Sequence, residues 1–163
     1  MMKHSFAAGA LAIFALGASP ALAATSTASA SINVVKPVQL TKLTDLTFGT
    51  VTFAGGSSGT GTVSISQAGV ITCTTGATCT GTPSAANFNV QGTNKMTVLI
   101  TVPTSSLSNG TDTMTFTPNA PASVYLPNSG APGVNFGIGG SVAIGAANQG
   151  TYTGSISVTA DYQ

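Results

Sequence analysis

The chain has 163 residues, of which 42% are hydrophobic and 4% are charged, and its formal net charge is +1 at pH 7. This length suits one domain. The high apolar content argues against intrinsic disorder, and the small number of charged residues argues against a phosphate-binding surface for nucleic acid. Its one His is His4, its three acidic residues are widely spaced Asp, and it has no Glu, Arg or Trp. Most nucleophilic, paired-carboxylate and zinc chemistry is thereby excluded, and we expect a protein that is not an enzyme and needs no metal or cofactor.

The first 23 residues have the pattern of a secretory signal peptide. Lys3 precedes an apolar run over residues 6–16, and Ala21 and Ala23 are small residues at the two positions that a signal peptidase reads. The run is shorter than the roughly 20 apolar residues of a membrane-spanning helix, so a membrane anchor is the weaker interpretation. We expect cleavage before Ala24 and export of the remaining chain.

Beyond this leader, apolar and polar residues alternate in short blocks separated by turn residues. In the first block, residues 24–35, every second residue from position 28 is apolar, namely Ala28, Ala30, Ile32 and Val34. Similar blocks lie at 38–40, 46–53, 63–65, 70–71, 88–90, 96–102, 114–116 and 134–144. A period of two is typical of strands with one buried face. About seven to nine such strands predict an all-β fold, an antiparallel immunoglobulin-like sandwich over residues 36–163.

The two cysteines, Cys73 and Cys79, are separated by five residues that include a glycine. Because an exported chain meets an oxidising compartment, this spacing favours a disulfide that closes a small hairpin or loop tip. Redox catalysis is the weaker alternative, since the spacing is not Cys-x-x-Cys and nothing nearby in the sequence would lower a thiol pKa. The Thr-Cys-Thr triplets at both cysteines are too few for the repeat array of an ice-binding solenoid.

Residues 118–132, which begin and end with proline, indicate a long surface loop. Tyr125 within this loop is a candidate stacking platform for a glycan. The simpler interpretation is that Tyr125 packs against the domain, as loop tyrosines usually do.

The last fourteen residues show the clearest alternation in the chain. Apolar residues and glycine alternate with Thr, Ser and Asp, and they are Tyr152, Gly154, Ile156, Val158, Ala160 and Tyr162. The pattern predicts a strand that continues to the last residues. An edge strand of this kind would leave backbone N–H and C=O groups unpaired and apolar side chains exposed, so we expect another strand to pair with it.

This ending resembles the C-terminal strand of pilus subunits assembled by the chaperone–usher route. In that family a periplasmic chaperone reads a glycine fourteen residues from the end, alternating apolar residues and a penultimate tyrosine, and these places are held here by Gly150, residues 152–160 and Tyr162. Residues 46–51, Leu-Thr-Phe-Gly-Thr-Val, and residues 150–154 also resemble the domain-of-unknown-function family 4402 of secreted proteobacterial proteins. That family is similar in layout to spore-coat-U-type and fimbrial subunits. The local cysteine spacing departs from the disulfide of many type 1 pilins, which joins distant strands.

The resemblance implies a structural subunit of a surface fibre. Each such subunit is an incomplete immunoglobulin-like sandwich whose missing strand comes first from a chaperone and then from the N-terminal extension of the next subunit. Residues 24–35 are then a candidate donor strand with Ala28, Ala30, Ile32 and Val34 pointing inward; the other interpretation is that they form the first strand of the chain's own sheet.

The partners implied by the resemblance are further copies of the chain, a periplasmic pilus chaperone and an outer-membrane usher. The implied location is a fimbria on the cell surface, reached through the periplasm. The alternative function is a self-complemented secreted or surface sandwich that binds a glycan or a protein partner.

Overall fold

The computed structural model describes residues 23–53, 60–145 and 149–163. The chain divides into two units, residues 1–33 and residues 34–163. In the first unit, the described residues 23–33 form no strand or helix, and every one of them is exposed. The leader predicted for residues 1–23 lies outside the described residues except for Ala23.

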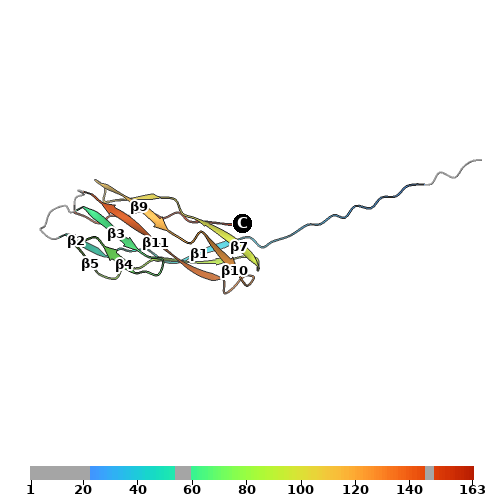
Figure 1. Cartoon of the computed structure of the whole chain (residues 1–163), viewed down its shortest axis with the longest axis horizontal. Coiled ribbons are helices and arrows are strands. Elements are labelled where there is room, and N and C mark those ends of the chain that lie inside the picture. Colours follow the sequence, from blue (N-terminus) through green and yellow to red (C-terminus); the bar gives the residue numbers. More distant parts are fainter. Residues whose placement is uncertain (1–22, 54–59, 146–148) are drawn as a thin grey trace, which may run out of the picture. The chain divides into compact units, whose positions relative to one another are not determined.

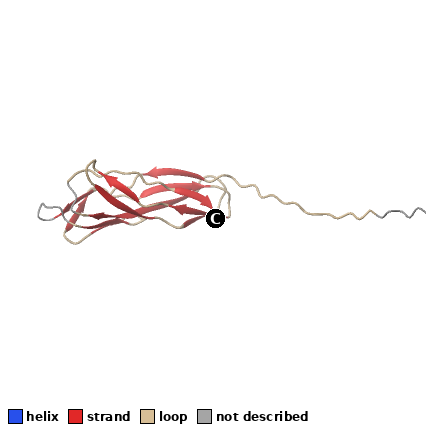
Figure 2. Cartoon of the chain, turned by 90° about the horizontal axis from the view of Figure 1, so that it is seen from above, coloured by secondary structure: helices blue, strands red, loops and turns tan. Residues whose placement is uncertain are grey.

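The second unit consists of strands joined by loops and turns (Figure 2), and its described part contains no helix. The strands are β1 (Gln39–Thr44), β2 (Thr50–Phe53), β3 (Gly61–Ile65), β4 (Ile71–Cys73), β5 (Ala77–Thr80), β6 (Ala86–Gln91), β7 (Met96–Thr101), β8 (Ser105–Ser108), β9 (Thr113–Asn119), β10 (Ser123–Leu126), β11 (Val134–Ile144) and β12 (Thr159–Tyr162). All of their pairings are antiparallel. The prediction of an all-β antiparallel sandwich is confirmed.

The strands form one large sheet, one small sheet and a two-stranded ribbon. The large sheet has the order β1-β6-β11-β3-β4, with β9 also pairing with β11 and β8 with β9. The small sheet has the order β10-β7-β12, and the ribbon pairs β2 with β5. β2 and β5 lie at one end of this unit, and β1, β7, β10 and the C-terminus lie toward the other end (Figure 1).

The long strand β11 joins the two parts of the large sheet. It pairs with β6 over residues 134–138 and then with β3 over residues 140–144. Gly137 and Gly139 allow the chain that leaves β3 to cross close to β11, because a Cβ at these positions would collide with the backbone carbonyls of Gln67 and Ile65. A bulkier residue at either position would push these segments apart.

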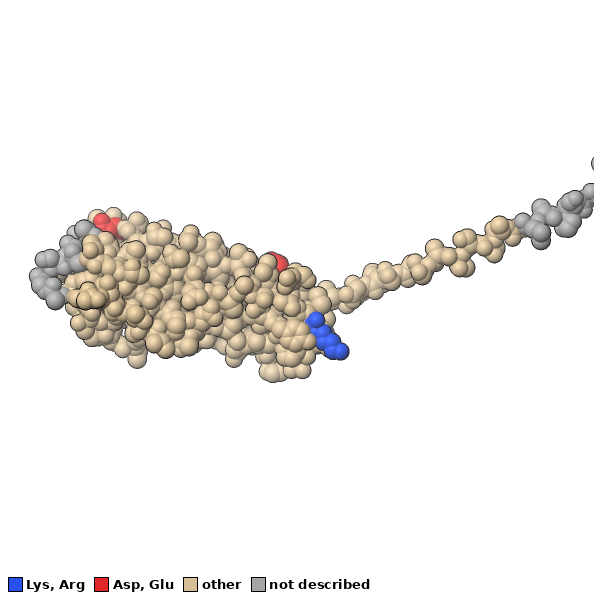
Figure 3. Space-filling view, in the orientation of Figure 1, with Lys and Arg blue, Asp and Glu red and all other residues tan. Residues whose placement is uncertain are grey.

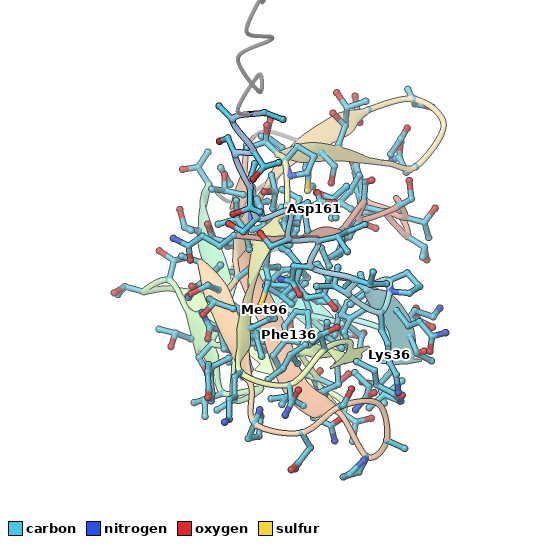
Figure 4. All side chains as sticks on the ribbon, turned by 90° about the vertical axis from the view of Figure 1, so that its right-hand side faces the viewer. Lys36, Met96, Phe136 and Asp161 are labelled. Atoms are coloured by element: carbon cyan, nitrogen blue, oxygen red, sulfur yellow. A yellow bond between two sulfur atoms is a disulfide. The ribbon has the colours of Figure 1, made fainter. Side chains whose placement is uncertain are left out.

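The hydrophobic core lies between the large and the small sheet. Its buried members come from β6, β7, β10 and β11 and are Ala86, Phe88, Val90, Val98, Ile100, Val124, Leu126, Phe136 and Ile138. Phe88 and Phe136 stack with ring centroids 5.9 Å apart, and Phe136 points into the space between the sheets (Figure 4). Side chains of β1 and of the C-terminal strand, Leu40 and Ala160 among them, pack against this cluster and cover it.

One prediction about this region is wrong. Residues 118–132 are not a continuous loop, because they contain the end of β9 and the whole of β10. β10 pairs with β7, and its alternate residues Val124 and Leu126 are 8% and 1% exposed. The described part of the chain also has more strands than the sequence predicts. The prediction missed β5 and β8 because they are rich in Ala, Ser and Thr and lack the bulky apolar pattern of a core strand.

Candidate functional site

A groove with an apolar floor and a volume of about 1310 Å³ opens at the end of the domain that carries β2. One wall is formed by residues 46–53, and the other by residues 149–154 together with Ile156. The floor consists of apolar side chains from β3, β8, β9 and β11, namely Val63, Leu107, Met114, Phe116, Val142 and Ile144. None of the described residues that line the groove is charged. Its volume exceeds the roughly 300–1,000 Å³ that is usual for a small-molecule pocket.

The first wall contains β2, and the second wall is a segment outside the named strands. The first wall pairs with β5 through β2, and Thr47 forms a bridge with Ser84. The second wall forms one bridge, between Thr153 and Ser108, before β12 pairs with β7. Neither wall pairs along its other edge with any strand in the described part of the chain. Each therefore presents backbone N–H and C=O groups that an added strand could use.

Apolar side chains around the groove are covered only in part by the described residues. Leu107, Met114 and Ile144 on the floor and Phe48, Phe53 and Ile156 on the walls are half-buried, whereas Phe116 and Val63 are each only 1% exposed. Phe48 packs edge-on against Phe116 with ring centroids 6.3 Å apart. At the other end of the sandwich, β1 and β12 supply the side chains that cover the core. The partly covered apolar region thus lies between the two walls of the groove.

The disulfide ties the first wall to the floor. Cys73 in β4 pairs across the ladder with Val63 of the floor, and Cys79 in β5 pairs with Val51 of the wall. Cys73 and Cys79 are bonded to each other, with their Cα atoms 6.3 Å apart. The predicted pairing is therefore present and closes a local loop. Its position shows that it holds the β2–β5 ribbon against the large sheet.

Tyr152 on the second wall has a polar neighbour. Its hydroxyl donates a hydrogen bond to Oδ2 of Asp112 at 3.5 Å. Partial burial and, to a smaller extent, the Asp112 carboxylate raise the pKa of Tyr152 above its ordinary value of 10.0. The hydroxyl is therefore neutral at physiological pH, and this wall remains uncharged beside the groove.

The C-terminal tyrosine closes the domain at the end away from the groove. The hydroxyl of Tyr162 donates to the carbonyl oxygen of Lys36 at 2.6 Å and accepts from the backbone N–H of Thr93, also at 2.6 Å. The backbone N–H of Lys36 donates to Oγ1 of Thr93 at 2.7 Å, which completes a ring of three hydrogen bonds. Gly92 leaves room for this ring, because a Cβ there would collide with the Tyr162 hydroxyl. Figure 4 shows Lys36 at the rim of the domain.

The N-terminal segment, residues 24–35, carries exposed apolar side chains. Ile32 is 89% exposed and Val34 is 80% exposed. The described residues 23–38 form no strand, so the structure gives no support to the interpretation that they begin the chain's own sheet. Bulky apolar residues that alternate with Ser31 and Asn33 and remain uncovered are typical of a segment that binds a partner.

The structure brings part of the predicted C-terminal set to the groove. Gly150, Tyr152, Gly154 and Ile156 line it, whereas Val158, Ala160 and Tyr162 lie beyond its end and pack against the core. The apolar residues of this set are half-buried, but the ladder covers only residues 159–162 and the bridge at Thr153. The predicted donor residues Ala28, Ala30, Ile32 and Val34 belong to none of the described strands.

Sequence analysis missed the first wall and the floor as parts of a site. Their alternation is that of any strand with a buried face, and it does not distinguish a covered apolar face from an uncovered one. The one signal that could have identified the wall is the block over residues 46–51, which carried the family resemblance and now forms most of that wall.

The outer surface of the small sheet holds a second, smaller apolar feature. Tyr125, the predicted glycan platform, is 56% exposed on β10, and Leu99 on β7 is 45% exposed. The register pairs Ser123 with Leu99 and Tyr125 with Thr97, so Tyr125 and Leu99 are diagonal neighbours. Charged atoms are few on the face of the domain in Figure 3.

The part of the chain that the structure describes has no helix long and apolar enough to cross a membrane, and no group of three or more His, Cys, Asp or Glu side chains placed to hold a metal ion. Comparison with known families matches residues 38–162 to the family described as Domain of unknown function (DUF4402). No curated protein and no solved structure matches the chain.

Proposed function

Because the chain belongs to the family described as Domain of unknown function (DUF4402), whose description names no activity, we propose its function from the groove. The protein is a structural subunit of an extracellular fimbria or pilus-like fibre and polymerises by donor-strand complementation. Residues 24–35 of one copy fill the groove of the next. The observation that carries this proposal is that one chain has both a groove with a partly covered apolar floor, between two walls that pair with no described strand along their other edges, and an exposed segment with alternating apolar residues.

The chemistry of the segment suits the groove. A strand laid between the two walls gains backbone hydrogen bonds along its length, and every second side chain points to the floor. With Ala28, Ala30, Ile32 and Val34 inward, the floor meets only apolar groups while Ser29, Ser31 and Asn33 face water. Residues 24–35 contain no charged residue, and none of the described residues that line the groove is charged, so pairing the two buries no unpaired charge among them.

The same groove accounts for the proposed partners. Before assembly, an uncovered apolar groove with free strand edges would promote aggregation. A periplasmic pilus chaperone that supplies a temporary strand removes this hazard, and an outer-membrane usher brings the next copy to displace it. We place the fibre on the cell surface, after export through the periplasm.

Assembly of the purified chain tests the proposal. The chain that begins at Ala24 should form a ladder of species that resists detergent at room temperature and falls apart to the monomer on boiling. Deletion of residues 24–35 should abolish the ladder, and a peptide of these residues should stabilise the shortened chain against thermal unfolding. A chain that is a stable monomer at high concentration, with or without residues 24–35, would contradict the proposal.

The exposed pair on the small sheet supports a second candidate function. A self-complemented secreted or surface sandwich could bind a glycan or a protein at Tyr125 and Leu99, since an exposed aromatic ring offers a face for stacking on a sugar. Glycan-array binding that is lost in Tyr125→Ala but kept after deletion of residues 24–35 would favour this function over the fibre.

A further inference from the structure

The ring of hydrogen bonds at Tyr162 lies at the root of the N-terminal segment. We propose that Tyr162 is a positioning residue: it holds the root of the segment at Lys36, so that a copy's own apolar residues cannot fill its own groove and the strand must come from a second copy. The inference rests on the proposed function, because it concerns the occupant of the same groove. It follows from three contacts and from chain lengths.

The contacts hold the root beside the end of β12, beyond the second wall. Lys36 is bonded through both its backbone N–H and its carbonyl oxygen, to Thr93 and to Tyr162. Tyr162 lies in β12, which is paired to β7 residue by residue, and its ring packs against the buried core. The position of Lys36 is therefore coupled to the end of β12. The distance from Lys36 to the groove can then be estimated from the number of residues between Tyr162 and the groove-lining residues.

The groove begins well away from this point. Ile156, the groove-lining residue nearest to Tyr162 in sequence, precedes it by six residues. At about 3.3 Å per residue this is roughly 20 Å, and Gln149 at the far end is roughly 43 Å away. The segment runs extended over this length, because its bridges to Thr101 and to Ser108 keep almost the same spacing on both strands. On the other wall, Leu46 follows Lys36 by ten residues through β1, which gives roughly 33 Å.

The bulky residues of the N-terminal segment are too close to their root to reach the groove. Ile32 precedes Lys36 by four residues and Val34 by two, so their Cα atoms stay within about 14 Å and about 7 Å of it even when the chain is fully extended. Ala28 could turn back only as far as the near part of the groove, at about 28 Å. If a copy's segment turned back onto its own groove, Ile32 and Val34 would stay outside that groove and the far part of the groove would be empty. The segment of a second copy is not limited in this way, because its root is not fixed to the first copy.

Lengthening the chain at its root tests the inference. An insert of about ten Gly and Ser residues between Val35 and Lys36 adds about 33 Å of reach, enough for Ile32 to cover the groove. We expect this variant to be a monomer by sedimentation velocity, with a melting temperature that does not depend on concentration, because its own segment now competes at a high effective concentration. The same insert placed before Ala24 is the matched control, and it should polymerise like the native chain.

The hydroxyl of Tyr162 is tested separately. Tyr162→Phe keeps the ring but loses both of its hydrogen bonds, so the root is held at Lys36 only by the bond from its backbone N–H to Oγ1 of Thr93. We expect loss of hydrogen-exchange protection at the amide of Thr93, which donates to the Tyr162 hydroxyl, and a monomer fraction between those of the native and the lengthened chain. Tyr125→Phe, at an exposed tyrosine, should change neither. Unchanged protection and unchanged assembly in Tyr162→Phe would overturn the role given to this residue.

The remaining outcomes separate the inference from the proposed function. If the lengthened variant polymerises like the native chain, own-groove insertion is not limited by reach, and the inference is wrong while the fibre stands. If the native chain is a monomer whose melting temperature falls when residues 24–35 are deleted, each copy already fills its own groove, and the inference is again wrong. If residues 24–35 affect neither assembly nor melting in any variant, the proposed function fails and the inference with it.

Discussion

Replacing Ile32 by Ala separates a role in assembly from a role in the stability of the unassembled subunit. Ile32 is 89% exposed, so its truncation should not change the free energy of unfolding of the free chain. In a filled groove the same side chain is buried. The substitution removes three carbon atoms, which at about 0.8 kcal/mol for each buried group is about 2.4 kcal/mol. Binding of the segment should therefore weaken about 50-fold.

The assay uses a receiver whose own donor is disabled. The receiver is the chain that begins at Ala24 and carries Ile32→Asp. Its groove stays intact, because residue 32 is exposed in the unassembled subunit. Its own segment is disabled as a donor, because this substitution would place a charge on the apolar floor of a groove. Fluorescence anisotropy then measures the binding of labelled peptides of residues 24–35. The native peptide should bind about 50-fold more tightly than the Ile32→Ala peptide, as worked out above. A Ser31→Ala peptide, altered on the face turned to water, is the matched control and should bind like the native one.

Two results would refute this reasoning. Equal affinity of the native and Ile32→Ala peptides would mean that Ile32 does not enter the groove. A loss with Ser31→Ala as large as that with Ile32→Ala would mean that the strand binds in the opposite register, since a shift by one residue exchanges the two faces.

Three further perturbations test the walls of the groove. Ile156→Asp places a charge on the second wall and should abolish the boiling-sensitive ladder on detergent gels. Ser157→Asp, on the exposed face, should preserve the ladder. An intact ladder in Ile156→Asp would contradict the position of the groove. Replacing Cys73 and Cys79 together by Ser should lower the free energy of unfolding by at most about 2 to 3 kcal/mol and should speed hydrogen exchange mainly in β2 and β5. Complete loss of the fold would show that the disulfide does more than hold the β2–β5 ribbon. Because the pKa of Tyr152 is raised in the folded chain, its neutral form contributes stability that is complete below pH 10.0 and is lost as the pH rises through the raised value. Tyr152→Phe should remove this alkaline loss of stability, measured by urea unfolding. If the loss is unchanged in Tyr152→Phe, another group causes it.

The features that the sequence predicts well are those set by local alternation. The all-β class, the block that became β7 and the apolar face of the C-terminal segment all follow from a period of two, which the burial of Val98 and Ile100 bears out. The cysteine pairing follows from spacing and from the expected compartment. In each case the signal lies within a few neighbouring residues.

The features that it missed depend on which segments meet in space. β8, with the sequence Ser-Ser-Leu-Ser, is a strand because β9 lies beside it, and no bulky apolar pattern marks it. Two prolines suggested a loop around β10, but Val124 and Leu126 carry enough apolar surface to anchor a strand there. Alternation likewise shows that one face of residues 46–53 is apolar, and it cannot show that no strand covers that face. The groove is therefore invisible until both walls are placed.

The proposed pairing of a donor segment with an acceptor groove, both on one chain, has a consequence for symmetry. A contact between the segment of one copy and the groove of another joins two unlike surfaces, so it is heterologous, and repeating it builds an open filament instead of a closed dimer. Such a filament is polar. At one end it leaves a copy whose groove is empty, with Phe48, Phe53 and Ile156 only half-buried, and at the other end a copy whose segment has no acceptor. A finite filament thus needs a different partner at its empty-groove end, one that supplies a strand without requiring another.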